Sequence, residues 1–276
     1  IAIEAFEKGK HVFSEKPDTI DVKEAIKMKK ASEKADKMLM VMRNNRFLNS
    51  SIFLKELIEE GKLGEIYAAK CGWRRRRGIP GKGGWFTTKS KSGGGPLIDL
   101  GVHMIDLAIW FMGNPVPVSV VGSTYSKFAD NDAEATSKHA EFGQSENEGV
   151  FDVEDLAMGF IKFDNGACLS IEFSWASNIE EEDRFVELMG TKAGSSWHSF
   201  DEKLKIFGEI NGKTYDQIPN IEEDKNIHGE HLNHFAECIL DGVEPIFTPE
   251  QGVNMIKILT SIYESARTGK EVQLIN

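Results

Sequence analysis

Hydrophobic positions in the first 43 residues alternate between helical and extended patterns. Residues 1–8 and 22–35 carry apolar side chains at helical spacing, and Asp21 stands where a cap for the second helix is expected. Residues 11–13 and 38–42 are short apolar runs of strand length, and a run that is apolar throughout is typical of a strand covered on both faces. This alternation of helices and strands predicts a parallel α/β sheet.

Strands dominate the pattern in the rest of the chain. Residues 156–163 and 167–175 are joined by Asn165-Gly166, the strongest local signal for a β-hairpin. Apolar and polar residues alternate along the second of these strands, so we expect one apolar face and one mixed face. A strongly apolar helix is predicted over residues 97–112, and two more helices close the chain. The second unit is therefore predicted to be α+β, built on a largely antiparallel sheet.

The composition excludes several classes of protein. The 276 residues suit about two domains of roughly 150 residues each. The chain carries 33 Lys and Arg against 44 Asp and Glu, a net charge of −11, so we expect no nucleic acid as a partner. No run reaches the ~18 apolar residues that a membrane helix needs, and we expect no membrane span. The three cysteines lie far apart without a C-x-x-C pair, which suits a reducing compartment and a cytoplasmic protein.

One lysine stands at a position suited to ligand binding. Lys16 lies between Glu15 and Pro17, directly after a strand of the parallel sheet. The carboxyl ends of parallel strands are where such sheets bind ligands, and a lysine there is able to stabilise negative charge on a substrate oxygen. The alternative is an ordinary solvated lysine.

The apolar helix carries a second group of polar residues. Asp99 and His103 are four residues apart and Asp106 follows three residues later, so all three are expected on one helical face. A carboxylate beside an imidazole orients the ring and raises its pKa, as a general base near neutral pH requires. The alternative is an ordinary Asp–His pair on the helix surface.

Other patterns point less clearly to chemistry. The four arginines at residues 74–77 are able to bind an anionic substrate or to be solvated on the surface. His228, His231 and His234 recur at helical spacing, but no carboxylate or cysteine completes a metal site. We therefore expect helix-surface histidines and no metal. The chain contains no G-x-G-x-x-G turn, P-loop or G-x-S-x-G elbow.

These fragments, taken together and in order, resemble one family. Glu15-Lys16-Pro17 resembles the Glu-Lys-Pro segment of the Gfo/Idh/MocA oxidoreductases, the family of glucose–fructose oxidoreductase and inositol dehydrogenases. Residues 93–106, from Gly-Gly-Gly-Pro to the second Asp, are similar to the second motif of that family over its whole length. Arg46-Phe47 resembles the Arg-Phe that follows the last strand of its nucleotide domain. The likeness extends over essentially the whole chain.

The resemblance implies a fold and an activity. Residues 1–45 would be the C-terminal part of a dinucleotide-binding Rossmann domain, since the family's G-x-G-x-x-G unit has no counterpart in this sequence. Residues 46–276 would form an α+β substrate-binding and oligomerisation domain, with a large, mainly antiparallel open sheet and helices on one face. The activity would be hydride transfer between NAD or NADP and a secondary alcohol of a sugar, cyclitol or related polyol. The implied catalytic residues are Lys16, Asp99 and His103, and the implied cofactor-binding residues are Glu15, Lys16, Pro17, Arg46 and Trp85.

Two other functions remain open from the sequence. Some relatives use transient oxidation to cleave a glycoside, which would keep the fold and the NAD while changing the product. A chain that cannot hold a dinucleotide would instead be a non-catalytic oligomerising or ligand-sensing module, and we expect the 276 residues alone to bind NAD(P) weakly or not at all.

The sheet of the second unit predicts self-association. Leu169 and its apolar neighbours on the strand are expected to lie under the helices, with Ile161 and Phe163 among the candidates for the opposite, outward face. A partly apolar sheet face left bare is a liability unless another subunit covers it. Since relatives pack such sheets together, we expect a homodimer or homotetramer through this face.

Overall fold

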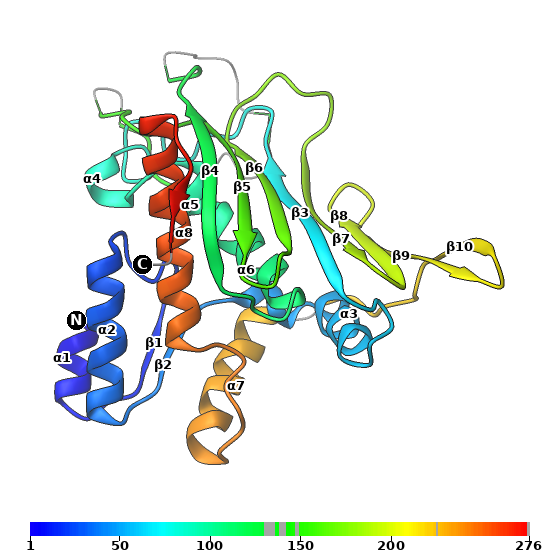
Figure 1. Ribbon diagram of the computed structural model, residues 1–276. Helices are drawn as coiled ribbons and strands as arrows, with labels where there is room; N and C mark the ends of the chain where they lie inside the picture. The colour runs from blue at the N-terminus through cyan, green and yellow to red at the C-terminus, as the bar shows by residue number, and fades with distance from the viewer. Residues whose placement is uncertain (130–135, 138–141, 147–148, 225, 275–276) are drawn as a thin grey trace.

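The N-terminal part of the chain forms a small parallel sheet and two helices that pack against each other. The computed structural model describes residues 1–129, 136–137, 142–146, 149–224 and 226–274. Strands β1 (Val12–Ser14) and β2 (Leu39–Val41) pair in parallel. Helices α1 (Ala2–Glu7) and α2 (Val22–Ala35) pack against each other on one side of these strands in Figure 1. The carboxylate of Asp21 accepts hydrogen bonds from the first-turn amides of α2, as a helix cap does. The predicted parallel α/β unit is confirmed.

A nine-stranded sheet makes up most of the remaining chain (Figure 1). Its strands stand in the order β10-β9-β8-β7-β3-β6-β5-β4-β11, and every neighbouring pair is antiparallel except β3 and β6. The strands are β3 (Ile66–Arg74), β4 (Pro117–Tyr125), β5 (Leu156–Phe163), β6 (Cys168–Ser174), β7 (Asp183–Gly190), β8 (Ala193–His198), β9 (Lys203–Ile210), β10 (Lys213–Gln217) and β11 (Val272–Gln273). The large, mainly antiparallel sheet is thus confirmed, and the Asn165-Gly166 turn joins β5 to β6 as predicted.

The helices of this unit gather on one side of the sheet. The helical segments are η1 (Asn44–Phe47), α3 (Asn49–Glu59), α4 (Lys89–Ser92), α5 (Pro96–Asp99), α6 (Gly101–Phe111), α7 (Ile227–Leu240) and α8 (Pro249–Thr268). Helix α6 packs on β3, β6 and β7, while α8 packs on β4 and also reaches α2. The face of β5, β6 and β3 turned to the viewer in Figure 1 carries no helix.

The predicted single helix over residues 97–112 is wrong. It divides at Leu100 into α5 and α6. In an unbroken helix the carbonyl of Asp99 would accept the amide of His103, but the His103 amide donates to the Leu100 carbonyl instead. The Asp99 carbonyl accepts from the ammonium of Lys16, at 3.0 Å. A contact between distant parts of the sequence therefore accompanies the break.

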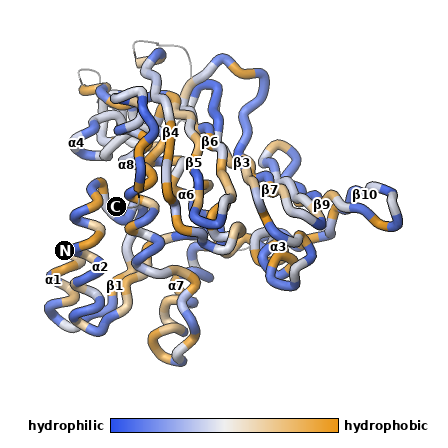
Figure 2. The backbone as a smooth tube through the Cα atoms, in the orientation of Figure 1, coloured by the Kyte–Doolittle hydropathy of each residue, from blue (hydrophilic) through white to orange (hydrophobic). Residues whose placement is uncertain are grey.

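The register of the hairpin corrects the expectation for Ile161 and Phe163. Ile161 pairs directly with Leu169, and residues directly opposite in an antiparallel pair share a face. Ile161 is 0% exposed and Phe163 3%, so both belong to the core beneath the helices. In Figure 2 part of the neighbouring strand β4 is orange, whereas the chain beyond the upper end of β3 is hydrophilic and blue.

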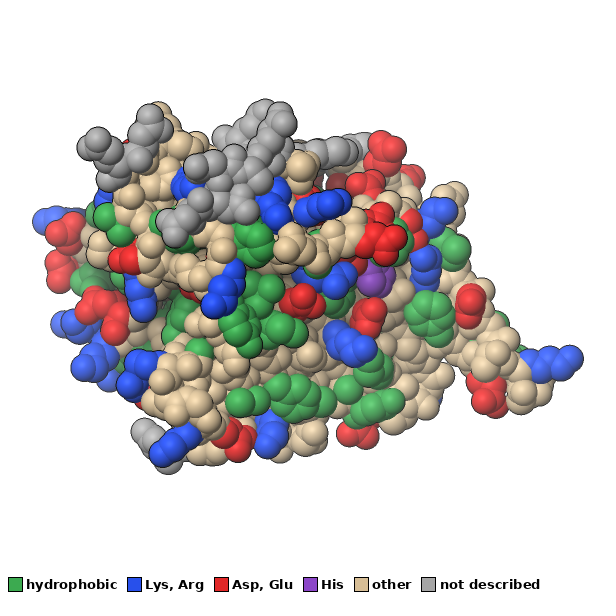
Figure 3. All heavy atoms as spheres, turned by 90° about the horizontal axis from the view of Figure 1, so that it is seen from above, with side chains coloured by type: hydrophobic (Ala, Val, Ile, Leu, Met, Phe, Trp, Pro, Cys, Tyr) green, Lys and Arg blue, Asp and Glu red, His purple; other side chains and the backbone are tan. Residues whose placement is uncertain are grey.

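No single helix among the described residues is long and apolar enough to span a membrane, whereas the bent pair Lys89–Asp99 and Gly101–Phe111 has sufficient length and apolar composition only when taken together. Most of α6 is buried in the core of the protein. Acidic and basic side chains are interspersed on the face that Figure 3 shows.

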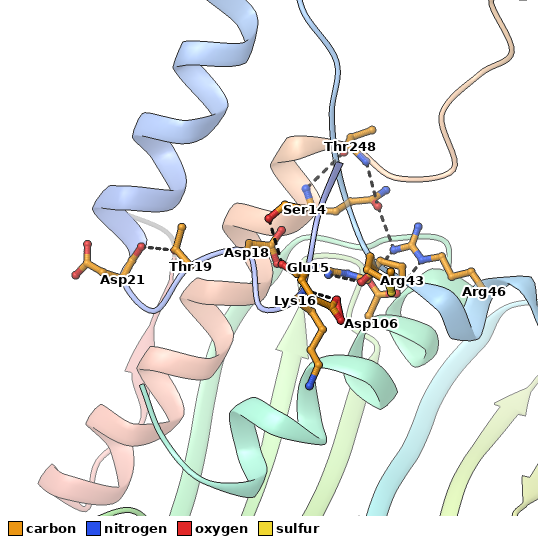
Figure 4. Close-up of polar contacts among 12 residues, drawn as sticks. Ser14, Glu15, Lys16, Asp18, Thr19, Asp21, Arg43, Arg46, Asp106 and Thr248 are labelled. Carbon is orange, nitrogen blue, oxygen red and sulfur yellow. Dashed lines mark hydrogen bonds and ion pairs between the residues drawn. The ribbon is translucent and has the colours of Figure 1, made fainter. Parts of the chain in front are cut away.

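A buried ionic cluster joins the small sheet to α6 (Figure 4). Arg43, just beyond β2, bonds the carboxylates of both Asp18 and Asp106, the second at 2.9 Å. Arg46 also bonds Asp106, at 2.7 and 2.8 Å, and the backbone carbonyl of Ile246. Burial alone would raise the pKa of Asp106, but the guanidinium groups of Arg46 and Arg43 hold it below its usual value. Asp106 is thus the shared anion of two buried cations.

Replacing Asp106 by Asn should destabilise the fold severely. The substitution keeps the size of the side chain but leaves two buried guanidinium groups short of negative charge, a loss of about 3–5 kcal/mol in the free energy of unfolding. Denaturant titration measures it. Glu264→Gln, which removes the partner of Arg267 in an exposed pair, is the matched control and should cost no more than about 0.5 kcal/mol. Equal, small losses for the two variants would contradict the role given to the cluster.

Candidate active site

A cavity of about 380 Å³ lies at the carboxyl end of β1, between the loops of the small sheet and the helical side of the large one. The small sheet contributes Glu15, Lys16 and Asn44 to its wall, and the second unit contributes Asp99 and His103. The three residues expected to act in catalysis therefore line one cavity. The carboxyl end of a parallel strand is also the predicted place for a ligand.

Lys16 reaches across the cavity wall to α5. Its ammonium donates to the backbone carbonyl and to the carboxylate Oδ1 of Asp99, both at 3.0 Å. Figure 4 shows its side chain turned away from the ionic cluster and toward the helices of the second unit. The side chain is 18% exposed, which leaves it accessible from the cavity while its position is fixed by two bonds.

Asp99 holds Lys16 rather than His103. Its second carboxylate oxygen accepts from the indole nitrogen of Trp175, at 3.1 Å, and the first is bonded to Lys16. The contact with His103 expected from four-residue spacing is not formed, because the helix divides between the two residues. Asp106, the other carboxylate of the motif, is bonded to Arg43 and Arg46 instead.

The electrostatics of His103 are opposite to the expectation. Burial holds its pKa well below the usual value, and the nearby charges of Lys16, Arg43 and Arg184 lower it further. The ring is half-buried in the cavity wall beside Trp73, with 6.4 Å between ring centres. His103 is therefore a neutral imidazole near pH 7, available to accept a proton.

The triglycine segment ahead of α5 is fitted to a buried carboxyl group. Glu154 accepts hydrogen bonds from the backbone amides of Gly95 and Leu97 and from the hydroxyl of Tyr263. A Cβ on Gly94 would lie 2.0 Å from that hydroxyl oxygen, so only glycine fits there. Burial raises the pKa of Glu154. Glu154 and Tyr263 thus position the start of α5, and no local pattern in the sequence marks either of them.

The expected cofactor-binding residues divide into two groups. Glu15, Lys16, Pro17 and the half-exposed Trp85 line the cavity. Arg46 does not: it is 1% exposed and belongs to the buried cluster with Asp106. The Arg46-Phe47 segment that resembles the family's Arg-Phe therefore forms a structural junction in this chain.

Several cavity residues were not among the expected sites. Asn44 and Arg75 each follow the end of a strand, a position that could have marked them as candidates. His228 lies on α7, and its ring nitrogen Nε2 is 3.2 Å from the amide nitrogen of Asn44. The Oδ1 atom of Asn44 is buried without a hydrogen-bond partner among the described residues.

The expectation of helix-surface histidines is wrong for His231. This residue is 0% exposed, its ring stacks on Phe47 at 4.6 Å, and its Nδ1 accepts the amide of Arg43 at 3.2 Å. Burial lowers its pKa to about 4. No three histidine, cysteine, aspartate or glutamate side chains within the described ranges are grouped to hold a metal ion.

Two family models match different parts of the chain. Residues 1–43 match a family model described as "Oxidoreductase family, NAD-binding Rossmann fold", and residues 55–274 match one described as "Oxidoreductase family, C-terminal alpha/beta domain".

Two curated relatives match nearly the whole chain. D-Glucoside 3-dehydrogenase of Escherichia coli (strain K12) is 34% identical over 272 residues, which cover 98% of this chain and 74% of that protein. The scyllo-inositol 2-dehydrogenase (NAD(+)) of Bacillus subtilis (strain 168) is 28% identical over 278 residues, covering 99% and 73%.

Among solved structures, levoglucosan dehydrogenase in complex with NADH and levoglucosan superposes with a TM-score of 0.82. The match has 22% sequence identity and covers all of this chain and 76% of that one, which shows a shared fold. Together with the two family models, these matches establish that the chain belongs to the Gfo/Idh/MocA oxidoreductase family.

Proposed function

We propose that this protein is an NAD(P)-dependent dehydrogenase or reductase acting on a secondary alcohol of a sugar, cyclitol or related polyol. The observation that carries the proposal is the convergence of Lys16 and His103 on one cavity, with Lys16 held by Asp99. Relatives named as dehydrogenases of a glucoside and of scyllo-inositol support the class of substrate.

The cavity suits the nicotinamide end of such a cofactor. The segment Glu15 to Pro17 and Asn44 line it at the carboxyl end of the parallel strands, where Rossmann-type sheets bind dinucleotides. The Oδ1 of Asn44, buried without a hydrogen-bond partner in the described part of the chain, is an acceptor suited to a carboxamide or hydroxyl donor. These residues would hold the cofactor, and when bound it supplies the hydride acceptor for alcohol oxidation.

Two side chains supply the proton chemistry. The neutral imidazole of His103 takes the proton of the substrate hydroxyl as the carbon–oxygen double bond forms, and returns it in the reverse direction. Lys16 donates a hydrogen bond to the same oxygen and stabilises its developing negative charge. Asp99 keeps the ammonium of Lys16 in place, so its part in the reaction is to position Lys16.

Substituting either group should lower turnover strongly. His103→Ala removes a positioned base and should reduce kcat by about 10²–10⁴-fold. Lys16→Ala should be similarly severe because the alkoxide-like oxygen loses its donor. Lys10→Ala, at an exposed position, is the matched control. Steady-state kinetics of NAD(P)H formation decides, and near-normal kcat in either site variant would contradict the mechanism.

The protonation of His103 is measurable without substrate. Its imidazole signals, assigned by comparison with His103→Asn, should titrate in NMR with a midpoint well below 6.5, since burial and nearby cations disfavour the charged ring. Lys16→Met should move the midpoint upward because it removes one of those cations. A midpoint at or above 6.5 would mean that His103 is not the neutral base described.

We also propose that the protein forms a homodimer or homotetramer in the cytoplasm. Its three cysteines are free thiols, which suits a reducing compartment. The helix-free face of the large sheet presents Val121 and Met158, 46% and 45% exposed, beside the half-buried Phe160. Apolar side chains grouped on a bare sheet face are typical of a subunit interface.

Light scattering at micromolar concentration should give two or four times the mass of one chain. Met158→Glu should lower that mass by placing a charge in the interface, whereas Leu240→Glu, at an exposed position on α7, should not. A single-chain mass that does not change with concentration would rule out the assembly.

A further inference from the structure

Arg75 is a buried cation in the wall of the active-site cavity to which the mechanism assigns no role. It stands one residue beyond β3, is 5% exposed and lines the cavity together with His103. The following inference rests on the proposed function, because it concerns the substrate of the same site.

Hydrogen bonds hold both the backbone and the side chain of Arg75 in place. Its amide donates to the carbonyl of Ser174, at 2.9 Å, and its carbonyl accepts from the hydroxyl of Ser177, at 3.1 Å. In the side chain, Nη1 donates to the carbonyl of Gly78 at 3.1 Å, and the guanidinium carbon lies 5.2 Å from the ring centre of Trp73. A Cβ on Gly78 would lie 2.8 Å from Cδ of Arg75, so this glycine makes room for the side chain.

Among the described residues, the guanidinium of Arg75 has no counter-ion. None of the described carboxylates forms an ion pair with it, and its Nε is buried without a hydrogen-bond partner in the part of the chain that the structure describes. The two acidic groups that influence it most are Asp99 and Glu182. Asp99 is bonded to Lys16 and Trp175, and Glu182 accepts the backbone amide of Arg76 at 2.8 Å.

An uncompensated buried charge is costly. Burial lowers the pKa of Arg75 against the influence of both carboxylates, which shows that its surroundings disfavour the charged form. Guanidinium nevertheless stays protonated in proteins. The cavity without ligand is therefore destabilised by a buried cation that has lost its hydration. A neutral polyol would leave that cost in place, whereas an anionic group on the ligand would offset it.

We propose that the substrate carries an anionic oxygen group, a carboxylate or a phosphate ester, which Arg75 binds. The planar guanidinium matches both groups through paired N–H donors. Trp73 lies near both groups, since its ring centre is 5.2 Å from the guanidinium carbon of Arg75 and 6.4 Å from the ring centre of His103. The wall of one cavity thus offers a guanidinium for the charged group of the substrate and an imidazole for its reacting alcohol.

The test compares matched neutral and anionic ligands on the full chain. Calorimetry without cofactor measures the binding of glucose, glucuronate and glucose 6-phosphate, and of myo-inositol and myo-inositol 1-phosphate. At least one anionic member should bind about 10- to 100-fold more tightly than its neutral counterpart, the range of a charge-assisted pair. Arg75→Gln should abolish that preference. Arg76→Gln, an exposed neighbour with the same change of net charge, should retain it.

Turnover with NAD and NADP separates this inference from the proposed function. If only neutral sugars are oxidised and Arg75→Gln does not change their turnover, the anion site is overturned and the dehydrogenase activity is supported. An Arg75-dependent preference for anionic sugars, without turnover under conditions in which calorimetry shows NAD or NADP to be bound, supports the anion site and overturns the dehydrogenase. Equal binding of neutral and anionic members, or a preference that survives in Arg75→Gln, also overturns the anion site.

Discussion

The active site depends on the double hydrogen bond from the ammonium of Lys16 to Asp99. One bond is made to the backbone carbonyl and the other to the carboxylate. The first occupies the carbonyl that would otherwise receive the amide of His103, and the helix divides there. The second uses the carboxylate that would otherwise have been free to approach the imidazole. A single side chain from the small sheet thus sets the geometry of the motif on the large unit.

The buried cluster around Asp106 helps to hold Lys16 and Asp99 in position for their hydrogen bonds. Asp106 lies one turn beyond His103 on α6, and its partner Arg43 also bonds Asp18, two residues after Lys16. The cluster therefore connects the segment that carries Lys16 to the helix that carries His103. Because breaking a buried pair leaves an uncompensated charge, its geometry is held firmly. Positions of about 0.5 Å matter for proton transfer, so such a brace has consequences for catalysis.

Local patterns in the sequence predicted the elements, and long-range contacts decided the site. The cap at Asp21, the hairpin at Asn165-Gly166 and the parallel pair β1–β2 all follow from residues that are neighbours along the chain. The break at Leu100 does not, because it coincides with a contact from a lysine 83 positions before Asp99. Glu154, which caps the first turn of α5, is likewise distant in sequence from the residues that it holds.

Two errors in the sequence interpretation have a common physical origin. The sequence alone predicts Ile161 on the outward face, but the pairing register places it beside Leu169 in the core. Spacing alone predicts His231 on the helix surface, whereas its ring stacks on Phe47 and its Nδ1 accepts the amide of Arg43. Spacing specifies which residues share a face of an element. It does not specify what that face is packed against, which depends on tertiary contacts.

The surroundings of His103 show how the site can use a weak base. A carboxylate partner would raise the pKa of the imidazole and strengthen it as a base; here burial and neighbouring cations lower the pKa instead. A weaker base suffices if the substrate proton is made more acidic, and the ammonium of Lys16 does this by stabilising the developing alkoxide. The same lowered pKa makes the protonated ring a stronger acid, so it readily returns the proton when the carbonyl compound is reduced. In the proposed mechanism Lys16 therefore acts on both partners of the proton transfer, and the two effects bring their acidities closer together.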